Sequence, residues 1–201
     1  MIIPVAHDFN CPWCWVALFQ TKQLKAEFGV EFEWRAYELM PEALPWDESA
    51  PRPEAKTDRP KTPTRMDLAY AAQGIPKPTA ERAKRMRTHN CHEAVEFAKL
   101  EGVHEPLIEA IYRGYWEQSL NVNEIDTLIE LAKACVSDLA GLRLAIETKQ
   151  FNDKIVPYDD EAYASGVYNV PTYWIGGERY AEQPISVLRE AIARELSGQP
   201  R

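Results

Sequence analysis

The sequence predicts an α/β fold, with a β-α-β unit, then a long helical block, then two strands and a helix. Three observations predict it: a strand-helix-strand pattern at the start, helical periodicity through the middle, and a Gly-Gly turn between two short predicted strands near the end. At 201 residues the chain is long enough to bury a core without metal ions or crosslinks.

The first 37 residues carry the β-α-β unit. Ile2–Ala6 is a short apolar run rich in β-branched residues, which predicts a buried strand. Pro12 suits the first position of a helix, and the apolar stripe that follows it ends at Gly29. Residues 30–37 alternate between apolar and charged side chains and therefore predict a second strand.

The middle of the chain reads as a loop followed by helices. Residues 41–63 hold six of the fifteen prolines and predict a long loop. Helical periodicity follows to about residue 165, weakly over Thr79–Leu100 and more strongly over residues 107–116, 125–135 and 139–146. These apolar faces can pack on one another as a helical subdomain.

The last part of the chain predicts a β-hairpin and a helix. Val167–Ile175 and Glu178–Ala181 read as strands joined by the two-residue turn Gly176-Gly177. A final helix is expected from about Pro184. The predicted organisation is one α/β domain formed by residues 1–40 and 166–201, interrupted by a proline-rich loop and an all-helical insertion over residues 41–165.

Charge is distributed unevenly along the chain. The 31 acidic and 23 basic side chains give a net charge of −8, which excludes a generally basic nucleic-acid binder. Residues 52–87 are the exception, with ten basic and four acidic side chains. We interpret them as a solvated helix face and a loop, with attraction of an anionic partner as the alternative. Nine of these ten basic side chains are Arg52, Lys56, Arg59, Lys61, Arg65, Arg82, Lys84, Arg85 and Arg87.

The N-terminal residues lack a basic segment and a long apolar run, and no stretch approaches the roughly 20 apolar residues of a membrane span. We therefore expect a cytoplasmic protein with no membrane association. That compartment is reducing, so a close pair of cysteines indicates redox or metal chemistry rather than a structural disulfide.

Cys11 and Cys14 form a Cys-Pro-Trp-Cys motif where the first strand turns into the first helix. Free backbone N–H groups and the helix dipole stabilise a thiolate at such a position, where thiol pKa values can fall from about 8.5 to between about 3.5 and 7.5. Cys14 faces the same side one turn later, so the two sulfurs can close a disulfide. We predict Cys11 as the nucleophile and Cys14 as the thiol that resolves a mixed disulfide.

Two other interpretations of this pair stay open. It could be half of a zinc site completed by Cys91, His89 or His92, or it could be two inert buried cysteines. Proline at the first helical position and the hydrophobic helix after it favour a redox pair, so we predict no metal. Cys91 and Cys135 each fall on an apolar helical stripe, and we expect both to be core thiols.

Four side chains close to the pair are further candidates. His7 could tune Cys11 or shuttle a proton, or it could be structural. Asp8 could accept a proton from Cys14, but a turn residue is the better interpretation. Trp13 is expected to offer an exposed apolar contact for substrate, and Trp15 to pack inward.

Three segments carry a more specific pattern: Asp8–Trp15 (DFNCPWCW), Trp34–Pro41 (WRAYELMP) and Gly166–Tyr173 (GVYNVPTY). Together they resemble the FrnE-like branch of the DsbA family, which is related to 2-hydroxychromene-2-carboxylate isomerases and kappa-class glutathione transferases. The resemblance spans nearly the whole chain. It implies a thioredoxin fold interrupted by a helical insertion, with thiol-disulfide oxidoreductase activity at the cysteine pair.

The resemblance also implies a cis peptide bond between Val170 and Pro171, facing the disulfide. A proline there lacks an amide donor and leaves the preceding backbone available to pair with an extended substrate. We expect substrate contacts at Pro12, Trp13, Val170, Pro171 and Thr172. The dipeptide between the cysteines is Pro-Trp, whereas strongly oxidising periplasmic members carry Pro-His, so we expect a milder redox catalyst.

The expected partners are protein or small-molecule thiols and disulfides, with no cofactor beyond the redox-active disulfide and with glutathione as a candidate co-substrate. A glutathione-dependent isomerase or transferase is the alternative, although such relatives typically have Ser where Cys11 stands. A non-catalytic binding module that uses the cis-proline groove is a third hypothesis. Exposed aromatic side chains could mark a homodimer surface.

Overall fold

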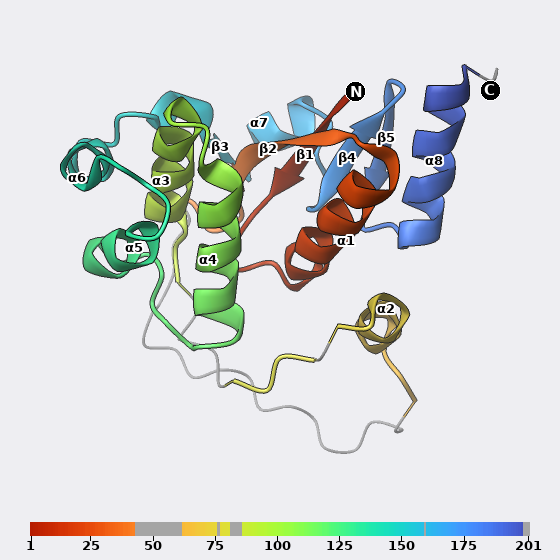
Figure 1. The fold of residues 1–201 in the computed structure, drawn as a ribbon, viewed down its shortest axis with the longest axis horizontal. Coiled ribbons are helices and arrows are strands. Elements are labelled where there is room, and N and C mark those ends of the chain that lie inside the picture. The colour runs from red at the N-terminus through yellow and green to blue at the C-terminus, as the bar shows by residue number, and fades with distance from the viewer. Residues whose placement is uncertain (43–61, 76, 81–85, 159, 199–201) are drawn as a thin grey trace.

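Figure 1 shows the computed structural model, which describes residues 1–42, 62–75, 77–80, 86–158 and 160–198. Within these ranges five strands form one mixed sheet in the order β3-β2-β1-β4-β5. β1 is parallel to β2 and β2 to β3, whereas β4 is antiparallel to both β1 and β5. The bounds are β1 Ile2–His7, β2 Glu31–Glu38, β3 Val156–Pro157, β4 Thr172–Ile175 and β5 Glu178–Ala181.

The predicted β-α-β unit is confirmed. Helix α1 spans Pro12–Phe28, with the proline in its first turn, where the missing amide costs no hydrogen bond. The helix ends at Gly29, whose φ of 64° is left-handed and whose N–H donates to the Lys25 carbonyl. Alternate residues of β2 are buried, so one face of this strand packs on the core.

The predicted hairpin and final helix are also present. Gly176 and Gly177 have φ values of 59° and 80°, and a two-residue hairpin turn requires such positive values. Helix α8 (Ile185–Ser197) follows and lies beside α1 in Figure 1. An ion pair of 2.8 Å between Arg189 Nε and Glu27 Oε2 links the two helices.

The helical segment lies between β2 and β4 in the chain. Within the described residues its α-helices are α2 Arg65–Gln73, α3 His89–Leu100, α4 His104–Trp116, α5 Ile125–Ala132, α6 Leu139–Glu147 and the short α7 Asp160–Ala164. In Figure 1, α3, α4, α5 and α6 gather at one side of the sheet, whereas α2 lies apart from them and contacts α1.

The buried side chains of the sheet and of the inserted helices form one continuous cluster. Helix α4 supplies the closest link to the N-terminal loop. Its Tyr112 ring lies 4.8 Å from the Phe9 ring, and the Trp116 indole N–H donates to the Phe9 carbonyl at 3.0 Å. The inserted helices therefore complete the core behind the residues that precede α1.

Three element boundaries differ from the prediction. The strand expected over Val167–Ile175 begins only at Thr172, because residues 167–171 form turns and irregular backbone. The segment predicted to be all-helical contributes β3, which at two residues is too short to show a periodicity. Of the described residues in the weak stripe over Thr79–Leu100, those from His89 onward form a helix, whereas residues 79, 80 and 86–88 are not helical.

Parts of two predictions lie outside the described residues. The proline-rich loop falls there over residues 43–61, while residues 41, 42 and 62–64 belong to no helix or strand. Of the basic side chains singled out, the structure describes Arg65 and Arg87. In the described ranges, the helices are too short or too polar to cross a bilayer.

Candidate active site

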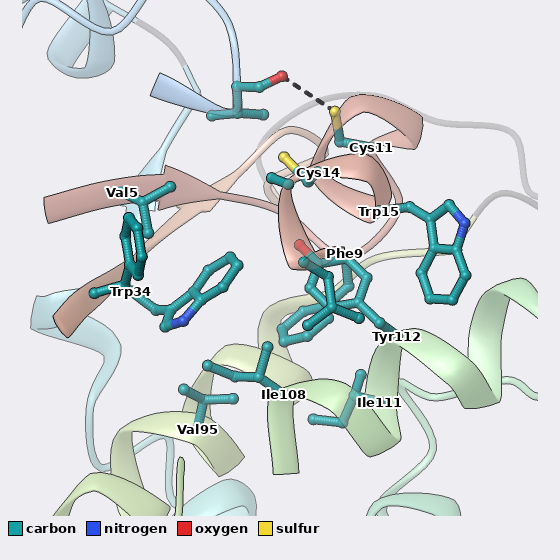
Figure 2. Close-up of a cluster of buried hydrophobic side chains, with 14 of the residues drawn as sticks. Val5, Phe9, Cys11, Cys14, Trp15, Trp34, Val95, Ile108, Ile111 and Tyr112 are labelled. Atoms are coloured by element: carbon teal, nitrogen blue, oxygen red, sulfur yellow. Dashed lines mark hydrogen bonds between the residues drawn. The ribbon is translucent and has the colours of Figure 1, made fainter. Parts of the chain in front are cut away.

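The two cysteines of the Cys-Pro-Trp-Cys motif lie at the N-terminus of α1. Cys11 precedes the helix with extended backbone, and its carbonyl accepts the first hydrogen bonds, from Cys14 N at 3.1 Å and Trp15 N at 3.2 Å. Both cysteines are free thiols here, and Figure 2 shows their sulfurs at the same end of the helix. The predicted position at a strand-to-helix turn is therefore present.

A cis peptide bond joins Val170 and Pro171, as the resemblance implied. The Cys11 thiol donates a hydrogen bond of 3.2 Å to the Val170 carbonyl oxygen, drawn as a dashed line in Figure 2. The two residues are 159 positions apart in the sequence. They meet because β1 and β4 are neighbours in the sheet, with Ala6 opposite Thr172.

The two cysteines differ in how deeply they are buried. Cys11 is 6% exposed, whereas Cys14 is fully buried. Burial raises the pKa of the Cys14 thiol well above its ordinary value, and a hydrogen bond with Cys11 raises this pKa further. Cys11 is thus the less buried of the two cysteines, and Cys14 is kept as a neutral thiol behind it.

Asp8 lies fully buried behind the dithiol. Its Oδ1 accepts hydrogen bonds from Phe9 N at 2.7 Å and Thr88 Oγ1 at 2.6 Å, and lies 3.2 Å from His92 Nε2. Its Oδ2 accepts a bond of 2.7 Å from Leu39 N. The interpretation of Asp8 as a turn residue was therefore incomplete, because its carboxylate joins the turn before α1 to the end of β2 and the start of α3.

His7 is buried next to Asp8 at the end of β1. The Tyr112 hydroxyl lies 2.9 Å from His7 Nδ1 and donates to the Asp8 carbonyl at 3.2 Å. Burial, and then electrostatic repulsion from the nearby His92 and Lys99 side chains, lower the pKa of His7 well below 6.5. His7 is therefore a neutral, hydrogen-bonded side chain near neutral pH.

This state of His7 predicts a pH-dependent stability. The unfolded chain takes up a proton on His7 below pH 6.5 and the folded chain does not, so the free energy of unfolding must fall as the pH drops below that value. At pH 5.5 this uptake lowers the free energy of unfolding by at most about 1.4 kcal/mol. In urea unfolding, the loss of stability between pH 7.5 and pH 5.5 should be smaller, by up to this amount, in His7→Gln than in wild type. Equal drops in the two proteins would contradict this origin.

The five predicted substrate-contact residues lie around Cys11. Pro12 and Trp13 are half-buried in the first turn of α1, whereas Val170, Pro171 and Thr172 are buried. The Thr172 hydroxyl donates to the Asn169 carbonyl at 2.6 Å, so in this structure it stabilises the cis-proline loop. Trp15 packs inward, as predicted, and is 1% exposed.

The side chains considered for a zinc site have other partners. The Cys91 thiol is buried and donates to the Val122 carbonyl at 3.2 Å. His92 faces Asp8, and His89 Nδ1 lies 3.2 Å from Glu38 Oε2. Among the described residues, no three His, Cys, Asp or Glu side chains are arranged to hold a metal ion.

Cys91 is a core thiol as expected, whereas Cys135 packs against the core but is not on a helical stripe. Helix α5 ends at Ala132, before the cysteine. Cys135 therefore lies in the following turn, where it is only partly buried, and its thiol lies 3.6 Å from the Ala132 carbonyl oxygen.

Sequence reasoning missed three side chains at the site. Tyr112 and Thr88 come from the inserted segment and reach Asp8 or His7. The Arg65 guanidinium carbon lies 4.5 Å from the centre of a Trp13 ring. The Thr64-x-x-Asp67 spacing is typical of a helix N-terminus and could have located α2, but no local signal shows what Arg65 contacts.

The comparison with known families agrees with this geometry. A family model described as a DSBA-like thioredoxin domain matches residues 2–193. The chain belongs to this family. In this DSBA-like thioredoxin domain the cysteine pair lies at the start of α1, and the cis-proline loop lies beside it, at the start of a central strand of the mixed sheet. The predicted thioredoxin fold is therefore confirmed.

Solved structures share the fold of this DSBA-like chain. A probable DsbA oxidoreductase from Streptomyces coelicolor has a TM-score of 0.74 at 24% identity, covering 100% of this chain and 92% of that one. A 2-hydroxychromene-2-carboxylate isomerase has a TM-score of 0.68 at 13% identity, covering 100% of both chains. The cytosolic disulfide reductase DsbM from Pseudomonas aeruginosa, also solved with GSH, has a TM-score of 0.60 at 16% identity, covering 96% of this chain and 99% of that one.

Proposed function

We propose that this protein is a thiol-disulfide oxidoreductase that acts through a Cys11–Cys14 dithiol and disulfide. The observation that carries the proposal is the contact of the Cys11 thiol with the Val170 carbonyl in the cis-proline loop. It brings Cys11, the less buried of the two cysteines, to a place where an incoming chain could meet both the N-terminus of α1 and the cis-proline loop. Cys11 acts as the nucleophile, and Cys14 as the resolving thiol.

In the oxidising direction, a substrate thiolate attacks Cys11 Sγ of the disulfide, and the Cys11–Cys14 bond breaks. Cys14 leaves as a thiolate and takes up a proton, a step that its raised pKa favours. A second substrate thiolate then attacks the substrate sulfur of the mixed disulfide and releases the Cys11 thiolate. The substrate loses two electrons to form its disulfide, and the protein gains them as its dithiol.

The cis-proline loop provides a place for an extended substrate backbone. No hydrogen bond within the described residues uses the Val170 amide, and Pro171 has no amide hydrogen to offer. A substrate segment can therefore pair with the backbone at Val170 while its cysteine faces Cys11. Pro12 and Trp13 border the same place from α1.

The narrower assignments belong to the same proposal. The motifs support the FrnE-like branch, and the likeness to a cytosolic reductase solved with GSH supports a cytoplasmic reaction with glutathione as co-substrate. The chemistry needs no cofactor beyond the cysteine pair. The intact Cys11 favours disulfide exchange over the glutathione-dependent isomerase or transferase that was the alternative.

The test is equilibration with glutathione. The protein is incubated with mixtures of reduced and oxidised glutathione, trapped with acid, alkylated, and analysed by mass spectrometry. We expect reversible interconversion of the Cys11–Cys14 dithiol and disulfide, at a potential milder than that of Pro-His enzymes. Parallel assays follow insulin reduction and glutathione conjugation of an electrophile. Absence of a Cys11–Cys14 disulfide at every ratio would refute the proposal, and conjugation that survives Cys11→Ser would favour the isomerase or transferase.

A further inference from the structure

We propose that Arg65, from the inserted helix α2, is a positioning residue for the dithiol site. It holds the Trp13 ring, which stands between the two cysteines in the sequence, at a fixed place beside the cis-proline loop. The inference rests on the proposed function and extends it: a residue of the insertion shapes the surface that a polypeptide disulfide must cross to reach Cys11.

Arg65 contacts Trp13 through a cation–π interaction. The Arg65 guanidinium carbon lies over a Trp13 ring, 4.5 Å from its centre, within the range of such an interaction. Trp13 is half-buried in the first turn of α1. A guanidinium over the ring restricts rotation of the indole, which forms part of the outer surface of the Cys-Pro-Trp-Cys turn.

Arg65 also contacts Glu182, which is hydrogen-bonded to the cis-proline loop. Its Nη1 lies 3.0 Å from Glu182 Oε2, and its Nη2 donates to the Glu182 carbonyl at 2.6 Å. The Glu182 amide in turn donates to the Pro171 carbonyl at 2.9 Å. A continuous chain of contacts thus runs from Trp13 through Arg65 and Glu182 to the cis-proline.

Local structure fixes the two middle members of this chain, Arg65 and Glu182. Arg65 is the first residue of α2, which a reciprocal capping box between Thr64 and Asp67 anchors at its start. Glu182 has a φ of 48°, a left-handed conformation that turns its carbonyl toward α2. The Glu182 side chain is 19% exposed and that of Arg65 is 63% exposed, so the ion pair alone would contribute little. Arginine suits this position because its guanidinium contacts the Trp13 ring and bonds Glu182 through two nitrogens, a two-pronged contact, at the same time.

The contacts border a hollow of about 370 Å³ that Trp13 links to the Cys-Pro-Trp-Cys turn. Trp13 and Arg65 line it together with Leu68 of α2 and Pro184 and Ile185 at the start of α8. A polypeptide bound at Cys11 is large enough to contact this surface as well, whereas a small alkylating reagent needs only the sulfur. Loss of Arg65 should therefore affect the two kinds of reactant differently.

The experiment compares Arg65→Gln and Arg65→Lys with wild type. We expect kcat/KM for insulin reduction to fall about fivefold in both variants, because a lysine ammonium neither presents a planar group to the indole nor forms the two-pronged contact. The rate of iodoacetamide alkylation at Cys11, located by mass spectrometry, should change by less than about twofold. The Trp13 indole N–H resonance, assigned with Trp13→Phe, should shift in both variants.

Lys77→Gln is the matched control, because Lys77 is a cation of the same insertion that pairs with Asp67 of α2 and touches neither Trp13 nor Glu182. It should match wild type in turnover and in the indole resonance. Wild-type turnover in Arg65→Gln, full rescue in Arg65→Lys, or an equal loss of alkylation would each overturn the proposal. Circular dichroism checks folding. If wild type reduces no disulfide, the proposed function fails, while an unchanged Trp13 resonance would independently refute the role of Arg65.

Discussion

Replacement of Cys11 by serine should reduce catalysed disulfide exchange at least about 1,000-fold, to the background rate. A serine oxygen can occupy the same site at the start of α1 but cannot form the mixed disulfide on which both directions of the reaction depend. The measurement is insulin reduction with glutathione as the electron donor, compared at equal protein concentrations. Cys11 is in contact with the cis-proline loop, so the change removes the chemistry and little of the packing.

Cys135→Ser is the control for this substitution. Cys135 is a partly buried thiol in the turn after α5 and belongs to no part of the proposed site. Its loss should leave turnover within about twofold of wild type. Turnover that persists in Cys11→Ser would refute Cys11 as the nucleophile. Loss of turnover in Cys135→Ser would indicate that Cys135, outside the proposed site, takes part in the reaction.

Removal of the Asp8 carboxylate should have the largest effect on stability. Asp8 is fully buried, and its carboxylate is the hydrogen-bond partner of the Phe9 and Leu39 amides, the Thr88 hydroxyl and the His92 imidazole. Asp8→Ala would leave these four groups without that partner. Unsatisfied buried donors cost about 1–3 kcal/mol each, and partners can find other bonds in part, so we expect a loss of about 3–5 kcal/mol. Urea unfolding at pH 7.5 measures it.

Two further variants make the result interpretable. Asp8→Asn keeps one carbonyl oxygen and should lose about half as much, which is measurable even if Asp8→Ala fails to fold. Asp138→Ala removes an exposed carboxylate that caps α6 by accepting from Gly141 N at 2.8 Å, and it should cost only about 1 kcal/mol. If Asp8→Ala and Asp138→Ala lowered the free energy of unfolding by similar amounts, the buried hydrogen bonds of Asp8 would not have the stabilising role assigned to them.

The parts of the fold that were predictable from the sequence are those fixed by short-range patterns. Pro12 and Gly29 mark the two ends of α1, and the Gly176-Gly177 turn specifies a hairpin register within a few residues. The same holds for the cysteine pair, because its place at the start of a helix follows from adjacent residues. The cis bond at Pro171 came instead from a resemblance, since most X-Pro bonds in proteins are trans.

The parts that escaped prediction depend on contacts between distant segments. Asp8 read as a turn residue because nothing near it in the sequence shows that Thr88 and Leu39 donate to it. Arg65 read as one charge in a solvated basic segment, although it meets Trp13 and Glu182 in the folded chain. Such assignments depend on how the insertion packs against the sheet, and periodicity carries no information on that packing.

Trapping of the mixed disulfide tests the central claim most directly. Without Cys14, an adduct between Cys11 and a substrate cannot be resolved from within the site. Cys14→Ser incubated with oxidised insulin should form a covalent adduct, seen on a non-reducing gel, mapped to Cys11 by mass spectrometry and released by dithiothreitol. The double variant Cys11→Ser/Cys14→Ser should form none. Absence of the adduct in Cys14→Ser, or its attachment through Cys91 or Cys135, would contradict the account.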